Sequence, residues 1–359
     1  MGKCDRRALI VARRSLFVIS RTVKLSLRLF SWPSVLILLL MFGLAFSCIS
    51  CDAPPFSEHG SLVRGPAYPP PSSNGGNRSI RVGHPLGLNA LNAALLAGDT
   101  SVALPSDHES WQGTNFHRPA ELFLWEIGND VEHIMFLARL PTVWLGLLLA
   151  AVGGRWAAEM AAGWRQYHLT SRIGPVSAGF VTLLLLAFDP NILAHMRLVT
   201  TDLGLTAAAC FAGFTLWRYL KKPDWMRVVV PGFALGLLLN TKFTALLFLP
   251  FFGIVILLGM SGFSRGQSPD APRNLRKSIA QVFLVYPVVG FLVLWAGHGF
   301  QSGTLMAPLP LLGRAGGMSI PLANYFDQLL DIGNRLEVST PAFLMGNYAD
   351  NGWWYYFPV

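Results

Sequence analysis

The stretch NILAHMRLVTTDLGLTAAAC, residues 191–210, joins two strongly apolar runs of the chain. It nevertheless carries His195, Arg197 and Asp202 within eight positions. If the connection is helical, His195 and Asp202 are seven residues apart and share one face. A solvated connecting loop is the alternative interpretation of the same residues. The fold and the function both depend on why an apolar chain places an acid, a base and a cation together at this point.

The composition predicts that lipid covers much of the protein surface. Of the 359 residues, 52% are hydrophobic and 13% are charged, whereas a typical soluble domain carries about 25% charged residues. The mean hydropathy is +0.45. A soluble enzyme of this length would need more polar residues to cover its surface. We therefore predict an all-α integral membrane protein.

Uncharged runs predict about seven transmembrane helices. The first, sixth and last runs are long enough to cross a hydrocarbon core of about 30 Å. The other four have 14 to 16 residues, and they can span if flanking Arg and Lys side chains reach the interface. The fifth and sixth runs could instead form one buried hairpin. The runs are 29–51, 140–154, 173–188, 203–217, 228–241, 243–264 and 278–313.

The distribution of Lys and Arg predicts the orientation. With the N-terminus inside, the inside segments 1–28, 155–172, 218–227 and 265–277 hold 8, 3, 4 and 4 of these residues, together 19 of 28. This is the positive-inside pattern of membrane proteins. It accounts for the net charge of +9 without a nucleic-acid partner. We expect a multi-pass protein of the cell (inner) membrane.

Three regions follow from this topology. Residues 1–32 form a basic cytoplasmic N-terminus, residues 33–297 a transmembrane module that includes a large outer loop at 52–138, and residues 298–359 an extracytoplasmic segment. Within the outer loop, the later part (119–141) mixes aromatics with carboxylates and could lie on the membrane surface as a helix. A secretory leader is the alternative for the first 50 residues.

The C-terminal sequence GWWYYFPV, residues 352–359, resembles an interfacial aromatic belt that leads into a further helix. We therefore expect the chain to be either a fragment or a natural short form. Cys48 and Cys51 form a CxxC pair, for which a redox or zinc site is the less favoured interpretation because no second pair exists.

Polar residues collect on the predicted outer side. A lone Lys242, flanked so closely by apolar residues, is costly near lipid and needs an anionic partner, either a carboxylate or a phosphate. Alternatives exist for single residues: an interfacial anchor for Arg139, an incidental loop residue for His84 and a boundary charge for Asp52. Besides the three residues of the opening stretch, the candidates are Asp52, Glu58, His59, His84, Arg139 and Lys242.

Several familiar motifs are absent from the sequence. It contains no GxxxxGK[ST], GxGxxG or DxD pattern, so no nucleotide or nucleotide-sugar site is indicated. GxSxG and HExxH are absent as well. An activated substrate would therefore come from the membrane. The scattered His and carboxylate residues form no clean ligand set, which leaves open whether a divalent cation is needed.

Four segments carry a resemblance to a known family. They resemble, in this order, glycosyltransferase family 39 and its polyprenyl-phosphate-dependent bacterial relatives, a group that includes protein O-mannosyltransferases and aminoarabinose transferases. The resemblance runs from about residue 48 to residue 359. The segments are FLARLPTVWLGLLLA (136–150), DPNILAHMRLVTTDLGLTA (189–207), PGFALGLLLNTKFTALLFLP (231–250) and GNYADNGWWYYFPV (346–359).

The resemblance implies a C-type glycosyltransferase fold. A sugar on a polyprenyl-phosphate donor is transferred to a protein, lipid or glycan acceptor at the outer face. In the family, an acidic pair just after the first helix supplies the catalytic base. Asp52 matches the first acid, whereas Ala53 stands where the family has Glu, and Glu58 and His59 are nearby substitutes.

Further positions match by the same resemblance. The HPP motif of the family reads His84-Pro85-Leu86, and the second acid of the family matches Asp202. Arg139 and Lys242 match the cations expected to stabilise the leaving phosphate. We predict Asp52 as the general base of an inverting transfer. We predict Asp202 as a second catalytic-site residue with a structural or acceptor-orienting role, and His195 and Arg197 as part of the polar pocket.

The sequence leaves two other classes of protein open. A transporter would place charged residues at mid-membrane, whereas the charges here lie at the ends of the apolar runs. A non-catalytic truncated membrane protein, such as an anchor or assembly factor, is supported by Ala53 and by the early end of the chain.

Overall fold

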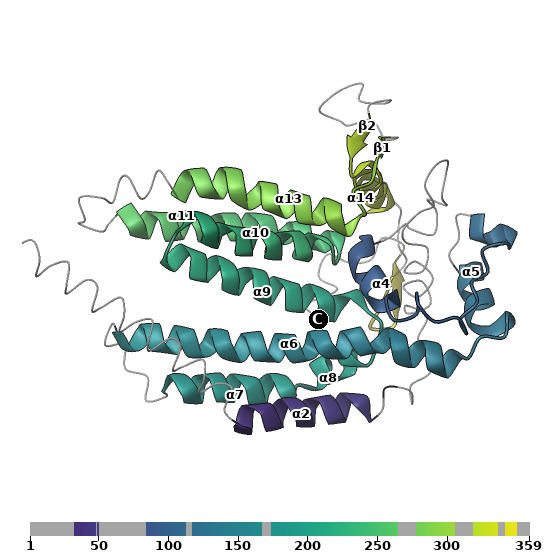
Figure 1. Cartoon of the computed structure of the whole chain (residues 1–359), viewed down its shortest axis with the longest axis horizontal. Helices are drawn as coiled ribbons and strands as arrows, with labels where there is room; N and C mark the ends of the chain where they lie inside the picture. The colour runs from purple at the N-terminus through teal and green to yellow at the C-terminus, as the bar shows by residue number, and fades with distance from the viewer. Residues whose placement is uncertain are drawn as a thin grey trace, which may run out of the picture.

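Each of the seven apolar runs contains a helix in the computed structural model. The structure describes residues 32–47, 49, 84–112, 117–166, 174–264, 278–305, 319–336 and 342–349. The helices of the apolar runs lie side by side along the long axis of the molecule (Figure 1). They are α2 (Trp32–Phe46), α6 (Val131–Gln166), α7 (Pro175–Ala187), α9 (Thr201–Lys221), α10 (Trp225–Leu239), α11 (Phe248–Ser264) and α13 (Tyr286–Gly297).

Among the described residues, three helical segments are long and apolar enough to cross a membrane. They are Val131–Gly163, Thr201–Lys221 and Ser278–Gly297. A fourth exists if α7 and the short α8 (Pro190–Met196), bent by 60° at their junction, are one broken span. The chain is therefore an integral membrane protein, whereas seven spans stay a prediction because α2, α10 and α11 are shorter apolar helices.

The outer surface of the helices is apolar, as lipid contact requires. Large side chains such as Leu185 on α7, Leu258 on α11 and Phe283 before α13 are 66% to 69% exposed. Leaving such residues in water would be unfavourable by about 1.5–3 kcal/mol each relative to burial. The exposed face of α11 also argues against the alternative in which residues 228–264 form one buried hairpin.

Helix α6 differs from its prediction. It begins at Val131 rather than near residue 140 and has 36 residues, so Arg139 lies two turns inside the helix. Charges do not stop the helix at its other end, because Arg155 donates to Glu159 at 2.6 Å in an i,i+4 pair. The segment 119–141 is therefore not one surface helix: α5 (His117–Glu121), the π-helical turn η3 (Leu122–Glu126) and the first part of α6 share it.

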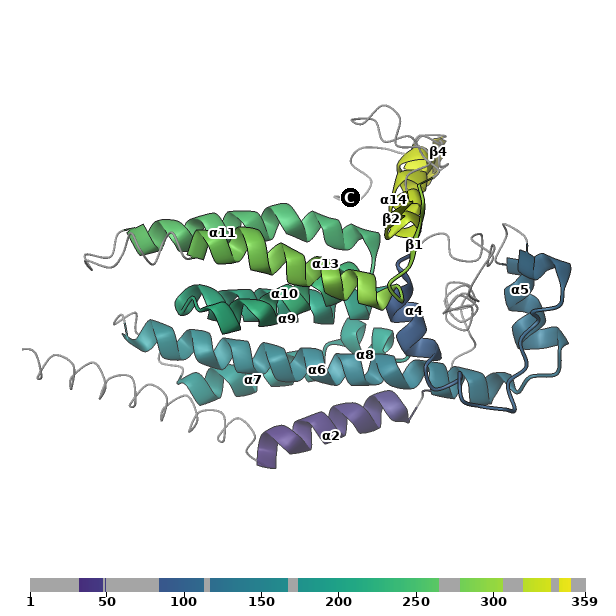
Figure 2. The ribbon, with the colours of Figure 1, turned by 45° about the horizontal axis from the view of Figure 1, so that its top comes forward.

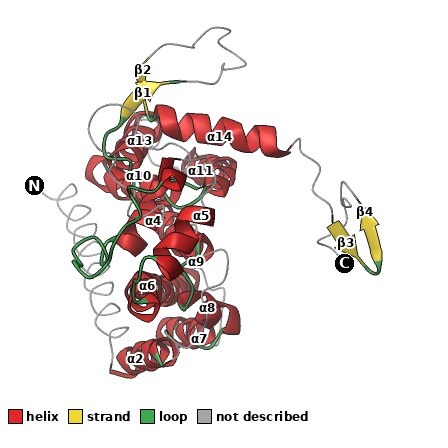
Figure 3. Ribbon diagram, turned by 90° about the vertical axis from the view of Figure 1, so that its right-hand side faces the viewer, coloured by secondary structure: helices red, strands yellow, loops and turns green. Residues whose placement is uncertain are grey.

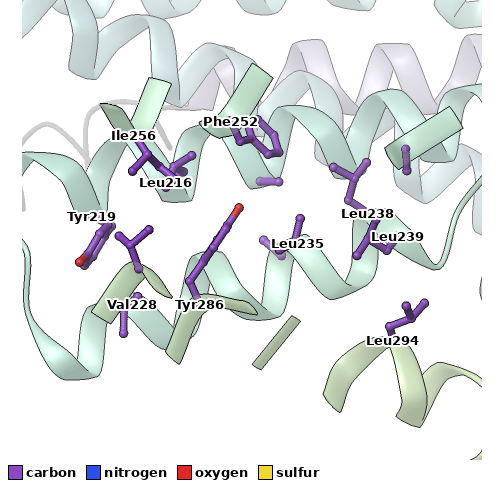
Figure 4. Packing of buried hydrophobic residues seen from close by; sticks show 14 of the residues in the cluster. Leu216, Tyr219, Val228, Leu235, Leu238, Leu239, Phe252, Ile256, Tyr286 and Leu294 are labelled. Atoms are coloured by element: carbon purple, nitrogen blue, oxygen red, sulfur yellow. The ribbon is translucent and has the colours of Figure 1, made fainter. Parts of the chain in front are cut away.

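Helix α9 lies between the two halves of the bundle. Its Leu203 and Ala207 belong to a core shared with α2, α6, α7 and α8. Its Leu216 and Tyr219 belong to a second core with α10, α11 and α13, drawn in Figure 4. The first turn of α9, which carries Asp202, therefore lies between the two halves at one end of the bundle.

Helices α10 and α13 approach each other closely at glycines. A Cβ atom built on Gly236 would lie 2.4 Å from Val293 Cβ and 2.6 Å from the Gly290 carbonyl oxygen. A Cβ on Gly232 would lie 2.8 Å from Val289 Cβ. Small residues four apart allow such contact between helices in membranes, so this pair fixes the position of the α10 C-terminus.

One end of the bundle carries additional elements, and we call it the α4 end. Here lie α4 (Leu86–Ala93), η2 (Glu109–Gln112), α5, the strands β1 (Ser302–Thr304) and β2 (Ser319–Pro321), and α14 (Ala323–Leu336) (Figures 1 and 2). Strands β1 and β2 are antiparallel, with Gly303 opposite Ile320. In the end-on view of Figure 3, α14 crosses the bundle end instead of running along it.

The remaining elements complete the described fold. The turn η4 (Phe243–Leu247) leads into α11, and η5 (Gln281–Val285) precedes α13. Strands β3 (Ala342–Leu344) and β4 (Asn347–Ala349) form an antiparallel hairpin. The part of the predicted outer loop that the structure describes, from residue 84 onward, is largely helical.

Candidate active site at the α4 end of the bundle

An ion pair between Asp202 and Lys242 lies at the α4 end. Lys242 Nζ donates to Asp202 Oδ1 at 2.8 Å. The Asp202 side chain is 54% exposed and the Lys242 side chain 25%. The sequence required an anionic partner for Lys242, and the structure provides a carboxylate that remains accessible to solvent.

The turn that carries Lys242 is fixed by the two residues before it. Asn240 Nδ2 donates to the Gly236 carbonyl of α10 at 2.9 Å and to the Val293 carbonyl of α13 at 3.2 Å. Thr241 Oγ1 donates to the Leu238 carbonyl at 2.6 Å. These side chains bind carbonyl groups near the helix ends, where intrahelical backbone partners are lacking. The backbone at Lys242 is therefore fixed to the end of α10.

Asp202 is positioned by a break between two helices. Asp189 caps α8 by accepting from the backbone N–H groups of Asn191 and Ile192, and Pro190 follows as the first helical residue. Helix α8 ends at Met196, and α9 begins at Thr201 after an extended Thr200. His195 and Asp202 therefore do not share a face of one continuous helix. Asp202 instead lies in the first turn of α9, where a negative charge is favourable.

Arg139 is completely buried, with 0% exposure. Its Nη1 donates to the carbonyl oxygen of Ile49 at 2.6 Å. This position excludes the alternative of an interfacial anchor that reaches into the headgroup region. Because Ile49 precedes Asp52 by three residues, Arg139 holds the chain just before the predicted base.

Thr142 connects this arginine with α8 and was not predicted from the sequence. Its hydroxyl lies 2.6 Å from the Arg139 carbonyl oxygen and 3.1 Å from the Met196 carbonyl oxygen. Gly146 allows the approach, since a Cβ there would lie 2.4 Å from Met196 Cγ. The hydrogen bond places the segment with His195 and Arg197 beside α6.

The three remaining described candidates come from segments that flank the ion pair. His195 is partly buried in α8, and its Nδ1 atom has no hydrogen-bond partner among the described residues. Arg197 is partly buried at the C-terminus of α8. His84 is partly buried two residues before α4 begins. Asp52, Glu58 and His59 lie outside the described residues.

Helix α4 packs next to the ion pair. Leu88 occupies the space beside Gly204, where a Cβ would lie 2.4 Å from its side chain. Gly87 lies against Asn240, because a Cβ built on Gly87 would be 2.8 Å from Asn240 Cβ. Gly204 and Asn240 are each two residues from a member of the ion pair, so α4 contacts both chain segments that carry Asp202 and Lys242.

Two buried asparagines on α4 were not predicted from the sequence. Asn89 is 1% exposed and Asn92 is 2% exposed. Within the part of the chain that the structure describes, neither amide atom of Asn89 has a hydrogen-bond partner, and the same is true of Asn92 Oδ1. A signal for them was present, because both asparagines are three residues apart in LGLNALNA and lie on one helix face.

Titratable groups around this end have shifted pKa values. Hydrogen bonds from Ser101 and from His133, whose Nε2 is 2.6 Å away, lower the pKa of Asp99 to about 2. Burial lowers the pKa of His298, directly after α13, although its bond to the Leu294 carbonyl opposes this. Burial also raises the pKa of Tyr325 on α14 to about 12. His298 and Tyr325 contact each other edge to face. Because their pKa values are shifted in these directions, both side chains are uncharged at neutral pH.

No group of three or more His, Cys, Asp or Glu residues that could hold a metal ion occurs within the described ranges. The candidate site consists of the exposed acid Asp202, the partly exposed Lys242 and α4, whose buried amides lack partners among the described residues. The buried Arg139 contacts the chain before Asp52.

Comparison with known proteins adds one match. Residues 149–295 match the family model described as dolichyl-phosphate-mannose-protein mannosyltransferase. No curated protein and no solved structure matches the chain. The chain thus resembles the family 39 membrane glycosyltransferases over a range that includes Asp202 and Lys242 and begins after Arg139.

Proposed function

We propose that this protein is a membrane glycosyltransferase that moves a sugar from a polyprenyl-phosphate carrier to a protein, lipid or glycan acceptor. The observation that carries the proposal is the Asp202–Lys242 ion pair of 2.8 Å at one end of an apolar bundle, within the range that matches the mannosyltransferase family. A lipid phosphate is an anion at the surface of a membrane, and Lys242 is a partly exposed cation at one end of the bundle.

The proposed reaction is a displacement at the anomeric carbon of the sugar. The acceptor hydroxyl forms the new bond to this carbon while the bond to the phosphate oxygen breaks, and the lipid leaves as a phosphate monoester. A carboxylate takes the hydroxyl proton, and such general-base assistance contributes roughly 10²–10⁴ in rate. Asp52 is the proposed base, and attack from the face opposite to the leaving group inverts the configuration.

Lys242 stabilises the charge that develops on the leaving phosphate. Charge-assisted hydrogen bonds to phosphate are about twice as strong as neutral ones, and they act best where water is scarce. Phosphate binding would compete with Asp202 for the Lys242 ammonium. Asp202, released from the pair, then accepts from the acceptor hydroxyl and orients it.

Arg139 acts as a positioning residue for the chain segment before Asp52. Its bond to the Ile49 carbonyl fixes the backbone three residues before Asp52, and its fixed charge favours an anion nearby. His84, His195 and Arg197 complete the polar surroundings of the substrate, and Glu58 and His59 lie close to Asp52 in the sequence.

The proposed orientation places the α4 end on the extracytoplasmic side of the cell (inner) membrane. The opposite end carries Arg155, Arg218 and Lys221 around Glu159, which fits the positive-inside pattern. Residues 33–297 are proposed as the transferase module with an outer segment at 52–138, and residues 298–359 as extracytoplasmic.

The test uses the full chain in liposomes with polyprenyl-phosphate mannose that carries a radiolabel on the sugar. We expect label to move into an acceptor fraction, and we expect Asp52→Asn to reduce the rate by at least about 100-fold. Transfer that continues unchanged in Asp52→Asn would remove this residue as the base. Sugar-lipid transport without transfer would favour a permease.

A further inference from the structure

The buried face of helix α4 has an unusual composition. Its buried residues are Leu86, Leu88, Asn89, Asn92 and Ala93. At 3.6 residues per turn, the two asparagines are about 60° apart and lie in the middle of the buried arc, with apolar residues at its margins. The centre of such a face is normally the most apolar part of an amphipathic helix.

Most amide atoms of these asparagines lack a partner. Both side chains are more than nine-tenths buried, and three of their four amide atoms form no hydrogen bond with any residue that the structure describes. Burial of an amide without a partner is unfavourable, and a leucine of similar size would avoid this cost. The arrangement is therefore explained best if another molecule supplies the hydrogen bonds.

The location of the asparagines connects them with the candidate site. On one side, α4 contacts Gly204 and Asn240, next to Asp202 and Lys242. On the other side, Leu96 shares a core with Ile134 of α6, and Arg139 lies further along this helix. Two more polar atoms without partners in the described ranges, His195 Nδ1 and Thr200 Oγ1, come from α8 and from the segment that joins it to α9.

We propose that Asn89 and Asn92 bind the hydroxyl groups of the sugar on the lipid-linked donor. This inference rests on the proposed function and adds a sugar subsite to it. A carboxamide offers one acceptor and two donor positions, which match neighbouring hydroxyls that both donate and accept. The sugar is bonded directly to the phosphate, so a subsite for it has to lie within one sugar unit of Lys242.

Buried water is the competing occupant. Ordered water often satisfies polar groups in protein interiors with about three hydrogen bonds. Water would fill the amide positions but would give no preference for a lipid that carries a sugar. The two occupants therefore differ in a measurable quantity, the ratio of the dissociation constants of polyprenyl phosphate and polyprenyl-phosphate mannose.

The experiment measures this ratio on the full chain in detergent for wild type, Asn89→Leu, Asn92→Leu and the matched surface control Leu91→Ala, since Leu91 is exposed on the same helix. We expect wild type and the control to bind the mannose lipid at least about tenfold more tightly than polyprenyl phosphate. In the asparagine variants this preference should fall to within about threefold, whereas the affinity for polyprenyl phosphate should stay unchanged.

Every other outcome contradicts either the sugar subsite alone or the subsite together with the proposed function. If wild type binds neither lipid, the proposed function fails together with the subsite. If polyprenyl phosphate binds but the sugar preference is absent in wild type or persists in both variants, the subsite is refuted and the proposed function survives. Thermal unfolding of the variants separates binding from folding, because leucine at these positions should maintain or raise the melting temperature. For a variant that does not fold, wild type with 2-deoxy-mannose and other deoxy-sugar lipids gives the same answer: equal affinities for all of them would overturn the subsite.

Discussion

Replacement of Lys242 by methionine tests the phosphate-binding role most sharply when it is compared with Asp202→Asn. Both changes remove the same 2.8 Å ion pair, so both variants lose its contribution to stability. Only Lys242→Met also removes the cation proposed to bind the lipid phosphate. The difference between the two variants therefore isolates the phosphate contact.

The expected magnitudes separate the two effects. An ion pair with partners 25% and 54% exposed contributes about 0.2–1 kcal/mol, so both variants should unfold only a few degrees below wild type. Loss of a hydrogen bond between charged groups costs about 1.5–3 kcal/mol. At about 1.4 kcal/mol for each factor of ten, the dissociation constant for polyprenyl phosphate should rise about 10- to 150-fold in Lys242→Met.

Donor titration in liposomes, with radiolabelled polyprenyl-phosphate mannose, gives KM and kcat for all three proteins. Lys242→Met should raise the donor KM and lower kcat. Asp202→Asn should lower kcat and leave the donor KM unchanged or lower, because its carboxylate no longer competes with the phosphate for Lys242. Equal loss of donor affinity in both variants would contradict the phosphate-binding role, because it would show that the intact pair, and not the lysine charge, is needed.

Three further predictions concern the frame of the site. Arg139→Leu removes the donor to the buried Ile49 carbonyl and should cost about 1.5–3 kcal/mol of stability; an unchanged melting temperature in thermal unfolding would contradict this. Gly236→Ala forces a Cβ to within 2.6 Å of the Gly290 carbonyl oxygen and should cost about 1–3 kcal/mol in the same measurement. The control Gly253→Ala in α11, with nothing within 4 Å, should be neutral or stabilising; equal effects would argue against close packing of α10 and α13. Burial lowers the pKa of His298 below its ordinary 6.5, so the unfolded state binds the proton first and the free energy of unfolding should fall as the pH drops below 6.5. Unfolding curves of His298→Gln should show a smaller decrease with pH. An identical pH profile of the two proteins would exclude this histidine as the cause.

The sequence was sufficient to predict an all-helical membrane protein and the pairing of Lys242 with an acid, whereas the number of seven spans stays a prediction. Uncharged runs identified every described helix that could span, because long apolar segments have few alternatives in water or lipid. The need of Lys242 for an anion predicted a partner, and Asp202 is that partner. Both predictions follow from the free-energy cost of placing charge near lipid. The sequence alone shows where charged residues interrupt the apolar runs.

Other features depend on three-dimensional packing and were predicted wrongly or not at all. Helix α6 extends past the charged Arg155 because Glu159 neutralises it one turn later, so the charge did not mark a helix end. The sequence left open whether the connection within 191–210 is helical or a loop. The structure has both, because Asp189 and Pro190 start the short helix α8 and an extended Thr200 separates it from α9. The three-residue spacing of Asn89 and Asn92 places both on one helix face, but that this face is buried depends on how α4 packs against α6 and α9.

The location of the bound lipid phosphate decides whether the α4 end of the bundle is the donor site. Polyprenyl phosphate with a photoreactive group beside the phosphate can be crosslinked to the full chain, and the adducts can be mapped by mass spectrometry. We expect adducts in α4, in the first turn of α9 and around Lys242, and their loss in Lys242→Met. Adducts confined to the opposite end, near Arg155 and Arg218, would contradict this expectation.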